Sequence, residues 1–373
     1  MHENDQSTMS EEIEGLDTSE IMGWGDYPLD SVFIRQEYRT VSEVVKRIKR
    51  ERFILNPDFQ KDFAWSVKKQ SKLIESCLMR IPLPVLYVAE AEDGRIIVVD
   101  GLQRLTTFMR YLNDEFSLSK LGDGKEDAPR DNPLIGKKFS ELPLNLQERV
   151  EDTQLILYVL DYKAPHRSKL NIFERVNSGE PLARQQMRNC LFSGPATKWL
   201  RKAAESKPFL TATGKSLNKK TMRDREAINR FCAFSLLGVE QYKGDMEDFL
   251  AKCLEKMNQT SDKDIKTLTH TFRQSMESNY LLFEKHAFRK SLAAKDTAAA
   301  RYVINMALFD VCSVIFSRLD PSVVEQKGKK ISEVIISLLN ENDFNDSITY
   351  ATNASKQVVK RFEMMEQAIR EVV

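Results

Sequence analysis

The stretch from Gly94 to Leu112 constrains the fold of this chain most, because its pattern changes from strand to helix within two residues. Ile96 to Val99 is a short run of β-branched apolar residues, which predicts a buried strand. After Asp100 and Gly101, apolar side chains recur at helical spacing. The sequence therefore predicts a strand that turns directly into an amphipathic helix.

Such a junction suits an anionic ligand. The first N–H groups of a helix have no partner within the helix, and the helix dipole places partial positive charge there. Arg104 adds a cation, Gly101 lets a ligand approach the backbone, and Gln103 supplies a hydrogen-bonding amide. A purely structural role fits equally well, with Asp100 capping the helix, Gly101 completing a turn and Arg104 pairing with a carboxylate.

Composition excludes several classes of protein. The chain has 56 Lys and Arg against 55 Asp and Glu, a net charge of +1, so any DNA contact needs a local basic patch. The five cysteines are scattered singly and the four histidines lie apart from them, which predicts reduced core cysteines, a cytoplasmic location and no zinc site. We expect no membrane partner, because the N-terminus does not resemble a signal peptide and Asn305 and Asp310 interrupt the most apolar segment.

The chain divides into three parts, and its length suits two domains. Residues 1–35 are acidic, without Lys or Arg before Arg35, and are predicted to form a flexible arm. Residues 36–195 mix strand and helix patterns, whereas residues 196–373 show helical periodicity throughout. The predicted fold class is therefore α+β, with a small mixed sheet followed by an all-α C-terminal domain.

Within the middle part, several elements are predicted individually. Thr40 and Ser66 are each expected to cap a helix, the first running to about Arg52. Strands are expected at 85–89 and 95–99, paired through a short turn, and at 153–161, where apolar residues on both faces indicate a central strand. Helices are expected at 168–176 and 183–192.

Short motifs occur in a fixed order between residues 36 and 195. They are Gln60-Lys61 with Trp65, Leu73-Ile74-Glu75-Ser76, Ile81-Pro82-Leu83-Pro84, Val99 to Thr107, Phe173 to Gly179, and Met187-Arg188-Asn189. This order resembles the N-terminal domain of the GmrSD type IV restriction systems, a family of the ParB/sulfiredoxin-like fold group. Several ordered blocks are more specific than one short motif.

The resemblance implies nucleotide binding and hydrolysis in antiphage defence. The family's usual pentapeptide is Asp-Gly-Gln-Gln-Arg, and Leu102 stands at its third position here. Lys61 replaces the family's usual arginine and loses its bidentate fork. The resemblance therefore implies an NTP with Mg²⁺ as ligand, supports binding better than fast turnover, and leaves open whether the chain is an NTPase.

The resemblance also assigns roles to residues. The catalytic set is Asp100 for a Mg²⁺-bound water, Gln103 for orienting a water, and Arg104 for phosphate charge. The implied nucleotide-binding residues are Gln60, Lys61, Gly101, Arg104, Arg175, Asn177, Arg188 and Asn189.

Two alternatives remain open at the sequence level. The first is a DNA-binding or DNA-cleaving protein, supported by a basic run that would contact phosphates, although such runs are more often solvated loops. That run comprises Lys215, Lys219, Lys220, Arg223 and Arg225. The second is a non-catalytic partner of a separate nuclease or toxin. After residue 195, the sequence has no histidines with the spacing found in the family's C-terminal nuclease, so we do not expect nuclease activity in this chain. The sequence leaves open whether the chain forms homo-oligomers.

Overall fold

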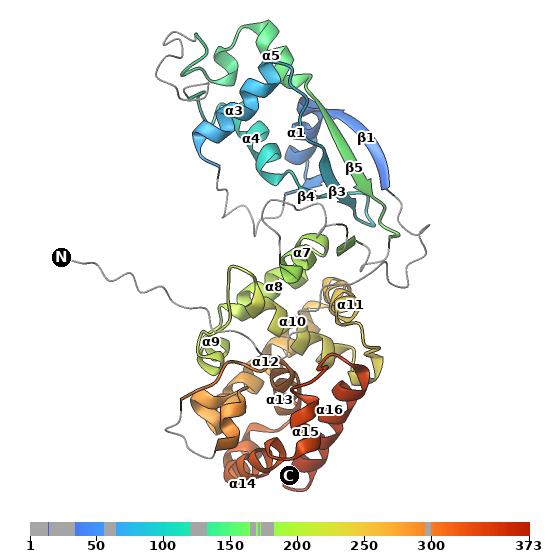
Figure 1. The fold of residues 1–373 in the computed structure, drawn as a ribbon, viewed down its shortest axis with the longest axis vertical. Helices are drawn as coiled ribbons and strands as arrows, with labels where there is room; N and C mark the ends of the chain where they lie inside the picture. The colour runs from blue at the N-terminus through green and yellow to red at the C-terminus, as the bar shows by residue number, and fades with distance from the viewer. Residues whose placement is uncertain are drawn as a thin grey trace, which may run out of the picture. The chain divides into compact units, whose positions relative to one another are not determined.

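The computed structural model describes residue 14 and residues 34–55, 65–119, 133–164, 169–170, 172, 183–294 and 300–373. The chain divides into two compact units (Figure 1). One unit comprises Asp26–Leu191, and the other comprises Met1–Gly25 and Phe192–Val373. Most of the predicted helix at 168–176 and most of the predicted acidic arm lie outside the described residues, and residues 169, 170 and 172 are helical.

The unit Asp26–Leu191 is built on one five-stranded mixed sheet with the strand order β1-β5-β3-β4-β2. Its strands are β1 (Ile34–Thr40), β2 (Phe53–Ile54), β3 (Leu86–Glu90), β4 (Ile96–Asp100) and β5 (Gln154–Leu160). The β1–β5 and β3–β4 pairs are antiparallel, whereas β3–β5 and β2–β4 are parallel. The prediction that 153–161 is a central strand is confirmed, as is the pairing of the two strands before the motif.

Helices cover both faces of this sheet. They are α1 (Val41–Lys49), α3 (Val67–Leu78), α4 (Leu102–Leu112), α5 (Leu144–Glu151) and α7 (Arg184–Leu191), with a 3₁₀ turn at Phe139–Glu141. Phe108 of α4 packs in one core with Val98 of β4. Met187 of α7 packs in a second core with Ile97, the neighbouring residue of the same strand. Because successive strand residues point to opposite faces, α4 and α7 lie on opposite sides of β4.

Both predicted helix caps are present. The Thr40 hydroxyl accepts from the Glu43 N–H at 3.2 Å, and the Ser66 hydroxyl accepts from the Lys69 N–H at 3.4 Å. Helix α1 ends at Lys49, before the expected Arg52. The reason is that Glu51 adopts a left-handed conformation with φ of 56°, which a right-handed helix does not allow.

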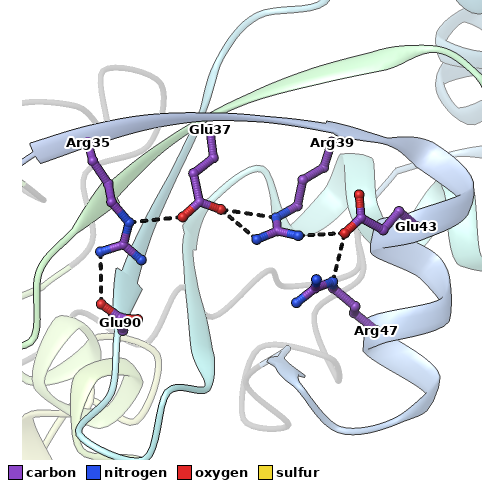
Figure 2. Close-up of polar contacts among 6 residues, drawn as sticks. All are labelled: Arg35, Glu37, Arg39, Glu43, Arg47 and Glu90. Atoms are coloured by element: carbon purple, nitrogen blue, oxygen red, sulfur yellow. Dashed lines mark hydrogen bonds and ion pairs between the residues drawn. The ribbon is translucent and has the colours of Figure 1, made fainter.

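The edge strand β1 was not predicted, because its outer residues are charged rather than apolar. Its charged side chains instead form a continuous series of ion pairs that reaches β3 and α1 (Figure 2). The series runs through Glu90, Arg35, Glu37, Arg39, Glu43 and Arg47. These side chains are between 18% and 42% exposed, so each pair contributes little alone. As a network, they fix the orientation of β1 against α1.

The second unit is helical, which confirms the predicted class for the C-terminal half. Its α-helices are α8 (Pro195–Ala204), α9 (Lys207–Thr213), α10 (Arg223–Leu236), α11 (Met246–Asn258), α12 (Asp262–Phe283), α13 (Met306–Phe316), α14 (Pro321–Leu339), α15 (Asn342–Ser347) and α16 (Ser355–Arg370). All five cysteines of the chain are buried and free, as their scattered positions predicted.

The polar residues that interrupt the most apolar segment are both used within the core. Asn305 caps α13 by accepting from the Leu308 N–H at 2.8 Å. Asp310 is fully buried and accepts from Arg230 at 2.8 Å and from Arg361 at 3.2 Å. Across the described ranges, no helix combines the length and apolar character that crossing a membrane requires.

Candidate functional site

The motif lies where β4 passes into α4. The strand ends at Asp100, Gly101 occupies the helix N-cap with φ of 98°, and Leu102 begins the helix. The pairing of β3 with β4 shifts at this point, because Val88 lies opposite Val98 while Tyr87 lies opposite Asp100. Such a bulge redirects the backbone next to a site. The strand-to-helix junction predicted from the sequence is therefore confirmed.

Gly101 is required at this junction for two reasons. Its positive φ is a conformation that other residues rarely adopt. A Cβ atom at this position would also lie 2.0 Å from Cδ2 of the buried Leu86. Because glycine has no side chain, α4 lacks the N-cap hydroxyl that Thr40 gives α1 and Ser66 gives α3. The N-terminus of α4 therefore keeps its capacity to receive an external anion.

The Arg104 guanidinium is held firmly beside this N-terminus. Its Nη2 donates to Asp100 Oδ2 at 2.9 Å and to the Val85 carbonyl at 3.1 Å, and its Nη1 donates to the Pro84 carbonyl. The side chain is 12% exposed. Burial lowers the pKa of Arg104, and the Asp100 carboxylate opposes that shift. Arg104 thus joins the end of β4 to the segment that leads into β3.

The remaining motif residues differ in how far their side chains are exposed to solvent. The Asp100 side chain is 36% exposed and pairs with Arg104 instead of capping the helix. Leu102 is partly buried against the core that α4 shares with the sheet. Gln103 is partly buried, and its main-chain carbonyl accepts from the Thr107 hydroxyl at 2.7 Å. Leu102 therefore replaces the family's polar residue with a packing contact.

Other residues implied by the resemblance are placed less directly. Gln60, Lys61, Arg175 and Asn177 lie outside the described residues. Arg188 and Asn189 lie in α7, both fully buried.

These two α7 residues share a polar network. Arg188 Nε donates to Gln185 Oε1 at 3.0 Å, and Gln185 Nε2 donates to Asn189 Oδ1 at 2.9 Å. Helix α7 contacts β4 on the face opposite α4. The sequence did not single out Gln185, although its spacing three and four residues before the other two places it on their helix face.

The five basic residues proposed for DNA lie in the loop after α9 and the first turn of α10. Lys215, Lys219 and Lys220 are exposed. Arg223 pairs with Glu226 at 2.7 Å, which neutralises part of the run. Arg225 follows in the same turn, and Arg301 approaches the backbone of this loop at Gly214. The structure therefore adds Arg301 to a basic surface that the sequence showed only in part.

The motif offers few side chains that bind metal ions. Within the residues that the structure describes, no group of three or more His, Cys, Asp or Glu side chains is arranged to hold a metal ion. Mg²⁺ commonly uses one or two carboxylates together with phosphates and water. Asp100, with its partly exposed carboxylate, fits that limited role.

The sheet, the strand-to-helix junction and the covering helices together form an α+β domain. The strand–glycine–helix turn in this domain is suited to binding an anion. Residues 41–193 match the model of a family described as "GmrSD restriction endonuclease, N-terminal domain". This match agrees with the resemblance that the ordered motifs predicted, and the family points to a component of a restriction-type defence system. Comparison with curated proteins and with solved structures gave no match.

Proposed function

We propose that the Asp100–Arg104 junction binds a nucleoside triphosphate with Mg²⁺, and that the chain is a nucleotide-dependent sensor or switch in a restriction-type defence system. The observation that carries this proposal is the N-terminus of α4, which begins at a glycine without a capping side chain beside a fixed guanidinium. Backbone N–H groups and a nearby cation favour a phosphate group over a neutral ligand.

Each motif residue takes a distinct part in this proposal. Gly101 allows the phosphates to approach the backbone, and Arg104 contributes positive charge while it stays bound to the Pro84 and Val85 carbonyls. Asp100 holds a water of the Mg²⁺ shell, and Gln103 orients the attacking water. Mg²⁺ supplies charge neutralisation on the phosphates.

Residues around the motif are proposed to complete the pocket. The residue at the third motif position, Leu102, is proposed to limit the rate of nucleotide hydrolysis. Gln60, Lys61, Arg175 and Asn177 are proposed to line the pocket, whereas Arg188 and Asn189, which are fully buried on α7, are proposed to support it from the other face of β4. We propose that hydrolysis is slow, because Leu102 packs into the core and gives no polar group to the nucleotide or to water.

Calorimetry with each of the four ribonucleoside triphosphates and Mg²⁺ tests the binding. We expect at least one to bind and Arg104→Ala to abolish that binding. Arg110→Ala is the matched control, because Arg110 lies on the same helix and pairs with Glu115 at 3.2 Å. The proposal fails if none of the four nucleotides binds, or if Arg104→Ala binds as tightly as the unmodified chain.

A second candidate function is contact with DNA through the basic loop. It is favoured by three exposed lysines on one loop, Lys215, Lys219 and Lys220, with Arg301 beside it. If all three contact phosphates, their joint replacement by alanine should reduce the slope of log affinity against log salt by about 3. A gel-shift titration at several salt concentrations measures this slope, with Lys330→Ala on α14 as control. An unchanged slope removes the support for DNA.

A further inference from the structure

Strand β1 forms the longer of the two edges of the sheet (Figure 1). It has seven residues, whereas β2 at the opposite edge has two. A two-residue edge is too short to pair stably with another strand, but a longer edge presents a row of main-chain donors and acceptors. Strand β1 is therefore the edge of this sheet to which a further strand can be added.

The main-chain groups of β1 point alternately toward β5 and toward the open side. Just after the strand, the Val41 N–H donates to the Thr153 carbonyl at 3.0 Å. This pair continues the register of β1 with β5, in which Thr40 lies opposite Gln154. Hydrogen-bonded and non-hydrogen-bonded pairs alternate along an antiparallel ladder. The odd-numbered residues of β1 therefore bond to β5, and the even-numbered ones direct their N–H and C=O groups to the open side.

The even-numbered residues in the middle of β1 are available for pairing. Gln36 and Tyr38 are exposed, and among the described residues no main-chain hydrogen bond reaches either of them from outside the sheet. Ile34 lies on the same face of the strand as Tyr38. Their side chains are 44% and 61% exposed. Exposed apolar side chains along an unpaired edge indicate an interaction surface.

The charged residues of β1 match a second copy of the same strand. Arg35, Glu37 and Arg39 alternate in sign on the other face of β1 (Figure 2). Two antiparallel copies of β1 can be related by a two-fold axis at Gln36. Arg35 of each copy then lies opposite Glu37 of the second copy, and Ile34 lies opposite Tyr38. Opposite charges and apolar side chains that face each other directly across two strands favour pairing.

The other two-fold registers are less favourable. An axis at Arg35 or at Glu37 would place identical charges directly opposite each other, which destabilises the pair. An axis at Tyr38 would require the main-chain carbonyl of Thr40 for the new ladder. Thr40 is the N-cap residue of α1, so its carbonyl already accepts the first bond of that helix. The charge pattern and the helix cap therefore select the register centred on Gln36.

We propose that β1 is a self-association surface, at which two copies of the chain pair antiparallel about a two-fold axis at Gln36. The sheet then continues from one copy into the other. Each copy uses its one long edge in this contact, so the pairing closes at a dimer and does not extend into a filament. This inference does not depend on nucleotide binding at the motif.

Sedimentation velocity of the full chain at several concentrations tests the pairing. We expect a monomer–dimer equilibrium. Gln36→Pro removes a donor on the open side without removing a bond to β5, so it should raise the dissociation constant by roughly tenfold or more. Gln36→Ala is the matched control, because it keeps the N–H and should dimerise like the unmodified chain. A monomer at every concentration, an assembly larger than a dimer, or equal dimerisation of the two variants would overturn the proposal.

Charge variants test the register and do not depend on the proline variant. Arg35→Glu makes positions 35 and 37 both acidic, whereas Glu37→Arg makes both basic. Each variant alone should stay monomeric where the unmodified chain dimerises, and a mixture of the two should form a heterodimer that added salt weakens. A folding defect would not be repaired by mixing. A mixture that stays monomeric, or single variants that dimerise as well as the unmodified chain, would show that this register is wrong.

Discussion

Arg104 Nη2 lies 2.9 Å from Asp100 Oδ2. Asp100 is the last residue of the strand, Arg104 is in the first turn of the helix, and Gly101 separates the two elements. The same guanidinium donates to the main-chain carbonyls of Pro84 and Val85. Two motif residues therefore fix the junction itself, in addition to any contact with a ligand. The structural and ligand-binding interpretations of Arg104 are compatible, because its charge persists while its hydrogen bonds shape the loop.

We predict that Arg104→Lys lowers both stability and nucleotide affinity. A lysine keeps the charge but donates from a single nitrogen atom, so it does not match acceptors that two separate guanidinium nitrogens reach here. Leaving partly buried acceptors unsatisfied costs about 1–3 kcal/mol. Urea unfolding measures the stability, and calorimetry measures the affinity. A lysine variant that is as stable as the unmodified chain would show that the contacts to Pro84 and Val85 are dispensable.

We predict that Gly101→Ala destabilises the sheet unit by about 3 kcal/mol, because the new Cβ combines a left-handed backbone with overpacking against Leu86. Gly94→Ala is the matched control, since its φ is also positive at 76° but a Cβ there meets no atom within 4 Å. The control should lose only about 1 kcal/mol. Equal losses in the two variants, measured by denaturant unfolding, would contradict the packing argument.

We predict that Leu102→Gln raises the rate constant of NTP hydrolysis more than it changes the affinity for NTP. The substitution restores the family's usual residue at the third motif position. It should also cost about 1 kcal/mol of stability, because Leu102 packs partly buried against the core. Phosphate release under single-turnover conditions reports the chemical step. A rate unchanged from that of the unmodified chain would show that position 102 does not limit turnover.

We predict that Asp224 makes the chain less stable as pH rises from 4 to 6. Burial raises the pKa of this carboxyl from 3.8 to about 6, although the Arg225 N–H donates to it. The folded state then holds a proton that the unfolded state has lost, so stability present at low pH falls as pH rises through this window. The full effect is about 3 kcal/mol.

Urea unfolding of Asp224→Asn at several pH values isolates this effect. The variant should lose less stability than the unmodified chain between pH 4 and 6, because it has no carboxyl group at position 224 to ionise. If the unmodified chain and Asp224→Asn lose the same stability over this pH range, the pKa of Asp224 is not raised in the folded protein.

The sequence by itself determined the strand–glycine–helix junction, the two helix caps, the central strand β5 and the helical C-terminal half. These features follow from local patterns, because apolar periodicity, capping side chains and a positive φ at glycine act over a few residues. The ordered motifs also predicted the family whose model residues 41–193 match.

Only the tertiary structure decided which partners the charged residues take. Strand β1 is stabilised by pairing with β5 and by ion pairs to β3 and α1, so its own pattern was not diagnostic. Arg104 meets the Pro84 carbonyl from twenty residues away, and Asp310 meets Arg230 from eighty residues away. Such contacts depend on how distant segments pack, and the spacing of residues along the chain carries no record of that packing.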